Sequence, residues 1–168
     1  MRRIALLSLL LPALTAGCGG GSNGATTQVA TNDGQPPSRA DFIGLADEIC
    51  RNHQSRREDL ESQAGELGPL TSKAKAHQAA ALLRKESANR KAEVQELRTL
   101  QPPAADSATV DSVLSLVGAE TVVIDRWAKA YDDLDAAAIR RLQIRLGVTA
   151  GKAAQRARAY GFQVCGQQ

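Results

Sequence analysis

Apolar side chains recur every three or four positions in four successive segments of the chain, which is the spacing of an amphipathic helix. The first segment begins at Ser38, a good N-cap residue with Asp41 three positions later, and ends between Gly65 and Pro69. Its apolar stripe consists of Phe42, Ala46, Ile49, His53, Leu60, Ala64 and Leu67.

The second segment runs from about Thr71 to Leu100 and stops before Pro102. Its stripe consists of Ala76, Ala80, Leu83, Ser87, Val94 and Leu97. The third segment follows a cap near Asp106 and ends at a turn that begins near Asp132. Its stripe consists of Val110, Val113, Val117, Thr121, Ile124, Ala128 and Tyr131.

The fourth segment follows the acidic turn and ends at Gly161, which suits a C-cap glycine with Phe162 packing back. Its stripe consists of Ile139, Leu142, Leu146, Ala150, Ala153, Ala157 and Tyr160. Gly147 and Gly151 weaken this helix and indicate a kink or a close helix contact. No segment shows the alternation of a strand.

The sign of the net charge alternates along the four segments, which are acidic, basic, acidic and basic in turn. Short connections favour antiparallel neighbours, and alternating charge disfavours wrong neighbours. The sequence therefore predicts an all-α fold, an antiparallel up-down-up-down four-helix bundle in which the first helix contacts the second and the fourth.

The N-terminus has the parts of an export signal. Arg2 and Arg3 precede an apolar run that is too short to span a bilayer, and small residues follow directly before Cys18. This arrangement resembles the lipobox of bacterial lipoproteins, although Thr15 stands where Leu is commonest. The resemblance implies cleavage after residue 17, acylation of Cys18 and a place on the outer face of the cell membrane.

The predicted organisation is a signal peptide at 1–17, a lipidated cysteine with a flexible tether at 18–37, and a helical domain at 38–168. Gly, Ser, Asn, Thr and Gln dominate the tether. Arg2 and Arg3 leave with the signal, so the formal net charge of +3 falls to about +1. Charge therefore gives no reason to expect nucleic acid as a partner.

Of the three cysteines, Cys50 and Cys165 remain once Cys18 is assigned to the anchor. An even pair in an exported protein predicts a disulfide. The alternative is a metal-bound or reactive thiol, which no CxxC motif, Cys-His pair or basic niche supports. An up-down-up-down bundle brings the two cysteines to one end.

Short motifs add a family resemblance. These are Asp47-Glu48-Ile49-Cys50, the Leu97-to-Pro103 stretch, and Gly161-Phe162 with Cys165-Gly166. In them the chain resembles a loose group of uncharacterised small exported helical proteins of high-GC Gram-positive bacteria. The resemblance implies a helical domain with one disulfide and transfers no activity.

A metal site is the first chemical hypothesis. His53 and His77, the only histidines, are offset along the predicted hairpin, and neither follows a Glu at the spacing of di-iron bundles. An interface role for His53 and a surface role for His77 are expected instead. The acidic cluster Asp132, Asp133 and Asp135 could bind a cation, but turn formation and capping of the fourth helix explain it better.

Two charge runs have ordinary explanations. The fourth helix is basic through Arg140, Arg141, Arg145, Lys152, Arg156 and Arg158. A surface for anionic lipid, wall polymer or nucleic acid is one interpretation; neutralisation by the acidic first and third helices is the preferred one. Glu58, Asp59 and Glu61, beside Arg56 and Arg57, are placed on a solvated face.

No catalytic motif occurs in the sequence, so no catalytic residue, metal ligand or cofactor is assigned. We therefore expect a non-enzymatic binding or interaction module in the cell envelope, with an envelope protein or a small apolar ligand between the helices as its partner. An envelope metal- or small-ligand-handling protein is the alternative, and an enzyme is third.

Overall fold

The computed structural model describes residues 37–167, and this part of the chain is all-helical. Its four long helices are α1 (Arg39–Leu67), α2 (Lys73–Thr99), α3 (Ser107–Asp132) and α4 (Ala136–Tyr160). A short 3₁₀ turn, η1 (Ala104–Asp106), precedes α3. No strand lies between residues 37 and 167. The all-α prediction is confirmed, while the predicted signal peptide and Cys18 lie outside the described residues.

The helix ends follow local rules of capping. Ser38 Oγ accepts a hydrogen bond from the backbone N–H of Asp41 at 3.2 Å, and Asp135 does the same for Ala138 at 2.9 Å. Gly161 ends α4 with φ +116°, and the N–H of Phe162 reaches the carbonyl of Ala157 at 3.1 Å. Three of the predicted signals therefore act as expected.

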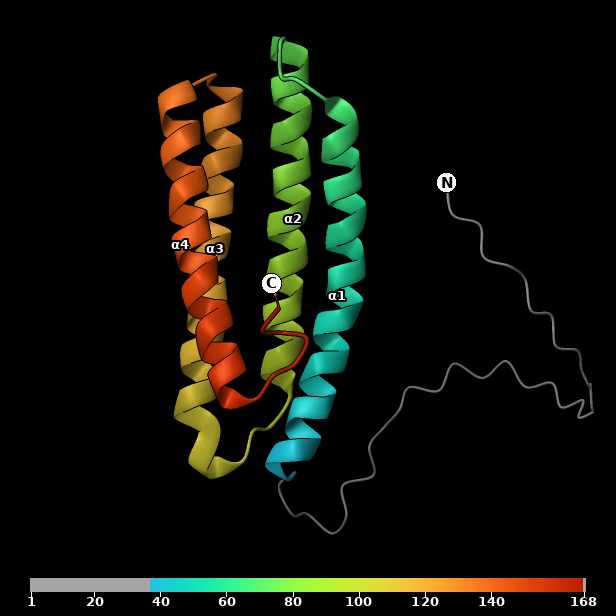
Figure 1. The fold of residues 1–168 in the computed structure, drawn as a ribbon, viewed down its shortest axis with the longest axis vertical. Coiled ribbons are helices and arrows are strands. Elements are labelled where there is room, and N and C mark those ends of the chain that lie inside the picture. The colour runs from blue at the N-terminus through green and yellow to red at the C-terminus, as the bar shows by residue number, and fades with distance from the viewer. Residues whose placement is uncertain (1–36, 168) are drawn as a thin grey trace, which may run out of the picture. The chain divides into compact units, whose positions relative to one another are not determined.

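Each helix contacts the next one along the chain: α1 lies against α2, α2 against α3, and α3 against α4 (Figure 1). The predicted contact between the first and the fourth helix forms only through side chains at one end, where Phe42 and Arg39 reach the ring of Tyr160; no Cα of α1 lies within 8 Å of a Cα of α4. Instead, the segment 161–167 runs from the end of α4 to α1 (Figure 1). The chain after α4 thus adds a second connection between the end of α4 and α1.

One end of the domain holds the main hydrophobic core. Phe42 of α1, Tyr160 of α4 and Phe162 form an aromatic cluster with ring centroids 4.9–6.2 Å apart. Leu97 of α2 and Val113 of α3 complete the same core. Large side chains therefore join α1 and α4 at this end without close backbone approach.

The disulfide between Cys50 and Cys165 is present, with a Cα–Cα distance of 5.2 Å. Beside it, the buried carboxylate of Asp47 accepts hydrogen bonds from the backbone N–H groups of Gln163, Val164 and Cys165 at 2.8–3.0 Å. A covalent bond and three charge-assisted hydrogen bonds thus fix the C-terminal segment on α1.

Helix α3 is the apolar centre of the domain. Ala104–Asp132 is the one stretch within residues 37–167 with the length and hydropathy of a membrane span. We interpret α3 as a core helix of the domain, because it contacts both α2 and α4 and buries Val110, Val113 and Ile124.

Gly147 and Gly151 lie in an unbroken α4, and a Cβ added at either would meet nothing within 4 Å. The predicted close helix contact at these glycines is therefore wrong. Replacing either glycine by alanine should raise the free energy of unfolding by about 1 kcal/mol, measured by urea denaturation. Gly161→Ala is the contrasting control: its positive φ and the Ile43 side chain at 3.1 Å predict a loss. A loss at both Gly147 and Gly151 would contradict this account.

Candidate functional site: a cavity between the helices

Helices α1 and α4 have no buried residues at the same end of the domain. No residue of α1 after Arg57 is buried, and no residue of α4 before Ala153 is buried. Both stretches carry apolar positions of the predicted stripes, among them Leu60 and Leu146. These side chains face a space that no neighbouring helix fills.

That space is a cavity of about 570 Å³ lined by residues of all four helices. Its apolar wall includes Leu60 of α1, Leu83 of α2, Trp127 and Tyr131 of α3, and Leu146 of α4. Both the size and the lining are typical of small-molecule pockets, which measure about 300–1,000 Å³ and are mostly apolar.

A cluster of five charged side chains separates this cavity from the core; we call it the Arg–Glu cluster. Its members are Arg57, Glu86, Arg90, Glu93 and Glu120. Arg57 Nη1 donates to Glu93 Oε2 at 3.0 Å, and Arg90 Nε donates to Glu86 Oε1 at 3.1 Å. Arg90 Nη1 lies 3.8 Å from both Glu93 Oε2 and Glu120 Oε2. Four of the five also line the cavity, Glu93 being the exception.

Burial dominates the electrostatics of the cluster. Loss of hydration raises the pKa of Glu86 and of Glu120, and the nearby guanidinium groups offset this only in part. The same loss of hydration lowers the pKa of Arg57. Three carboxylates and two guanidinium groups give the cluster a formal charge of −1.

The raised pKa values of Glu86 and Glu120 predict a pH dependence of stability. Above the unfolded value of about 4.3, the folded protein holds more protons than the unfolded chain until the pH passes the raised values. The free energy of unfolding should therefore fall as pH rises through this window, as urea denaturation would record. The double variant Glu86→Gln/Glu120→Gln should flatten this fall, whereas Glu48→Gln/Glu66→Gln, on exposed positions, should not. Parallel profiles for all three proteins would contradict this interpretation.

Polar atoms in this region lack partners. Arg57 Nη2, Glu86 Oε2 and Trp127 Nε1 are buried and have no hydrogen-bond partner among residues 37–167. All three residues line the cavity. The side chain of Arg57 is only 8% exposed, so bulk water does not readily supply the hydrogen bond that Nη2 lacks.

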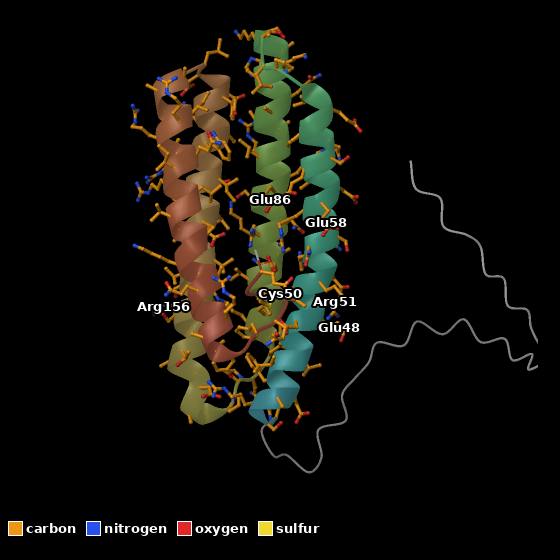
Figure 2. All side chains as sticks on the ribbon, in the orientation of Figure 1. Glu48, Cys50, Arg51, Glu58, Glu86 and Arg156 are labelled. Atoms are coloured by element: carbon orange, nitrogen blue, oxygen red, sulfur yellow. A yellow bond between two sulfur atoms is a disulfide. The ribbon has the colours of Figure 1, made fainter. Side chains whose placement is uncertain are left out.

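The predicted solvated face of α1 needs one correction. Glu58, Asp59 and Arg56 are exposed as expected, and Figure 2 labels Glu58 on α1. Arg57, which the sequence placed on that face, is buried because it points toward Glu93 of α2.

Both histidines make interhelical contacts. His53 is buried between α1 and α2, where Nδ1 lies 2.8 Å from Asn89 Oδ1 and Nε2 lies 3.1 Å from Glu96. The partly exposed His77 hydrogen-bonds Asp132 at 2.9 Å. The structure therefore does not bring the two histidines together, and the predicted interface role of His53 is confirmed.

The acidic turn is occupied by internal contacts. Asp132 binds His77 and Arg84, whose hydrogen bonds lower the pKa of Asp132, while Asp133 pairs with Lys129 and Asp135 caps α4. Within the described part of the chain, no three His, Cys, Asp or Glu side chains are grouped to hold a metal ion.

The basic residues of α4 are not neutralised as expected. Within residues 37–167 no ion pair joins α4 to another helix. Arg156 bonds Ser112, and Arg158 bonds the carbonyl of Gly166. Figure 2 shows Arg156 on the outer side of α4. The direct pairing expected with the acidic first and third helices therefore does not form, even though α3 packs against α4.

No known protein family, curated protein or solved structure matches this chain. The cavity and its polar groups therefore carry the functional argument.

Proposed function

We propose that this chain is an extracytoplasmic, membrane-anchored lipoprotein whose helical domain binds a small apolar ligand. The cavity of about 570 Å³ between the four helices carries this proposal. An apolar cavity that no helix fills, with one side open to solvent, favours a small ligand, whereas a filled core would favour a protein partner on the surface. No single feature of the described residues favours the metal-handling alternative.

The anchoring part of the proposal rests on the lipobox-like sequence before Cys18. The disulfide between Cys50 and Cys165 supports an exported protein, since such bonds persist in oxidising compartments. Cys18→Ala should leave the precursor unprocessed or release the protein from the membrane fraction. Unchanged mass and membrane partition would refute lipidation.

The up-down-up-down arrangement is part of the same proposal. Contacts between α1 and α2 run in opposite residue order, from His53–Glu96 to Arg57–Glu93. The pairs Arg84–Asp132 and Lys91–Asp125 do the same for α2 and α3. These pairs support antiparallel neighbours, with the cavity lying where the bundle is left open between α1 and α4.

We propose a binding role without catalysis. The sequence contains no catalytic motif, and the charged side chains Arg57 and Glu86 of the cavity form ion pairs with other residues of the Arg–Glu cluster. Their remaining unpartnered atoms can orient a ligand through hydrogen bonds.

Binding of N-phenyl-1-naphthylamine, an uncharged probe that fluoresces in apolar surroundings, tests the ligand site. We expect saturation at one probe per chain. Ala79→Phe places a ring in the cavity and should abolish binding, whereas Ala81→Phe, on an exposed position of the same helix, should not. Absence of saturable binding, or equal loss in both variants, would overturn the ligand-binding function.

A further inference from the structure

Three unpartnered polar atoms belong to residues that line the cavity and indicate which hydrogen bonds a ligand could make there. They comprise one acceptor, Glu86 Oε2, and two donors, Arg57 Nη2 and Trp127 Nε1. A hydroxyl group offers one donor and two acceptor lone pairs, which is the complement of this set. Because buried polar groups without partners are costly, a ligand that satisfies them gains affinity and specificity.

The charge of the Arg–Glu cluster narrows the choice further. An anionic head group would add to a buried layer that already carries a formal charge of −1. A cationic head group would balance that charge, but it brings only donors and leaves Arg57 Nη2 and Trp127 Nε1 without an acceptor. An uncharged head group meets both conditions.

We propose that the cavity takes an uncharged amphiphile, with an aliphatic body against the apolar wall and a hydroxyl head group against Arg57 and Glu86. This inference rests on the proposed ligand-binding function and adds the ligand class. Leu60, Leu83 and Leu146 contact the body, and the Arg–Glu cluster sets how deep the molecule enters.

Three probes with the same chain length test the head group: 1-decanol, decanoate and decylammonium. Each competes with N-phenyl-1-naphthylamine on the full chain carrying Cys18→Ser, so that no acyl chain on the protein competes. We expect 1-decanol to bind at least about tenfold more tightly than either charged probe. Trp127→Phe should lower the affinity for 1-decanol about fivefold and leave the affinity for decylammonium unchanged.

The outcomes separate this inference from the proposed function. If the fluorescent probe binds but decanoate or decylammonium equals 1-decanol, the head-group assignment is overturned and the cavity stands. If the fluorescent probe does not bind, the proposed function itself fails. The three probes are ranked on the unsubstituted cavity, so this comparison does not depend on whether a cavity variant folds.

A different surface carries a second inference. Arg141, Ile144, Arg145, Val148 and Lys152 follow one another at the spacing of a single helix face on α4. Ile144 is 70% exposed and Val148 is 53% exposed, and none of the three cations forms an ion pair within residues 37–167. Aliphatic side chains between unpaired cations fit the boundary between lipid headgroups and acyl chains.

We infer that this face of α4 docks on anionic lipid headgroups. Nucleic acid fits this face less well for two reasons. Exposed aliphatic side chains do not contribute to phosphate contacts, and the face carries no aromatic side chain that could stack on bases. Docking would hold the domain against the same bilayer that the proposed anchor enters.

Cosedimentation of the full chain carrying Cys18→Ser with vesicles tests the docking. We expect binding to phosphatidylglycerol vesicles and little binding to phosphatidylcholine vesicles. Arg141→Gln/Arg145→Gln should weaken the affinity about 30-fold, at about 1 kcal/mol per cation. The pair Arg51→Gln/Arg56→Gln removes the same charge from exposed positions of α1 and should have little effect. Equal binding to both vesicles, equal losses in both variants, or preference for a DNA duplex would overturn this inference.

Discussion

Replacing both Cys50 and Cys165 by serine is expected to lower the free energy of unfolding by about 4–5 kcal/mol. The disulfide joins residues 115 positions apart, so its loss returns a large amount of conformational entropy to the unfolded chain. Urea denaturation of the double variant and of the unsubstituted protein measures the difference.

The Asp47 carboxylate makes this prediction sharper. In the double-serine variant, Asp47 still accepts its hydrogen bonds from residues 163–165, so the C-terminal segment should stay on α1 at low urea. Asp47→Asn on that background should then release the segment and lower the free energy of unfolding by a further 1 to about 3 kcal/mol. A loss below about 1 kcal/mol for the double-serine variant would mean that the cross-link contributes little.

Arg57→Met is expected to lower the free energy of unfolding by about 3 kcal/mol or more. Arg57 is buried against Glu93, and its removal leaves the buried carboxylates of Glu93 and Glu120 and the partly buried one of Glu86 with Arg90 alone. Methionine keeps much of the side-chain volume, so the effect reports charge more than packing. Thermal or urea denaturation at neutral pH measures this loss.

Two further variants check the cause of that loss. Arg56→Met changes an exposed arginine next in sequence and should stay within about 0.5 kcal/mol. Arg57→Met/Glu93→Met removes a positive and a negative charge together and should recover part of the stability of the single variant. If the double variant is less stable than Arg57→Met alone, uncompensated charge is not the reason.

Local signals made much of the fold predictable from the sequence. The apolar periodicity located the four helices, Ser38 and Asp135 supplied caps, and Gly161 supplied the end of α4. The disulfide was predictable because two cysteines remained after the first was assigned to the anchor. The helix signals depend on residues close in the sequence, and the disulfide depends on the number of cysteines. None of them requires knowledge of tertiary packing.

The cavity and the Arg–Glu cluster were not predicted, although the sequence held a signal for part of them. The stripe of the first helix skips from His53 to Leu60, and that of the second skips from Ser87 to Val94. Arg57 and Arg90 occupy the inward positions in those gaps. A charged residue in an apolar stripe indicates a buried ion pair or a site, and this pattern was assigned to solvent for Arg57.

The separation of α1 from α4 could not be read from the sequence. The segment 161–167 connects the end of α4 to α1, where Asp47 and Cys50, distant in the sequence, hold it. Alternating charge indicated the neighbours α1–α2, α2–α3 and α3–α4 correctly, but ion pairs between helices form only among α1 to α3, and the cations of α4 form none in the described part of the chain.

Energy transfer from Trp127 to bound N-phenyl-1-naphthylamine is the most direct test of a ligand site between the helices. Trp127 is the only tryptophan of the chain, and it lines the cavity. The account predicts that Trp127 emission falls as the probe binds and stops falling at one probe per chain. Tryptophan emission that is unchanged at saturating probe, or that falls without saturation, would contradict it.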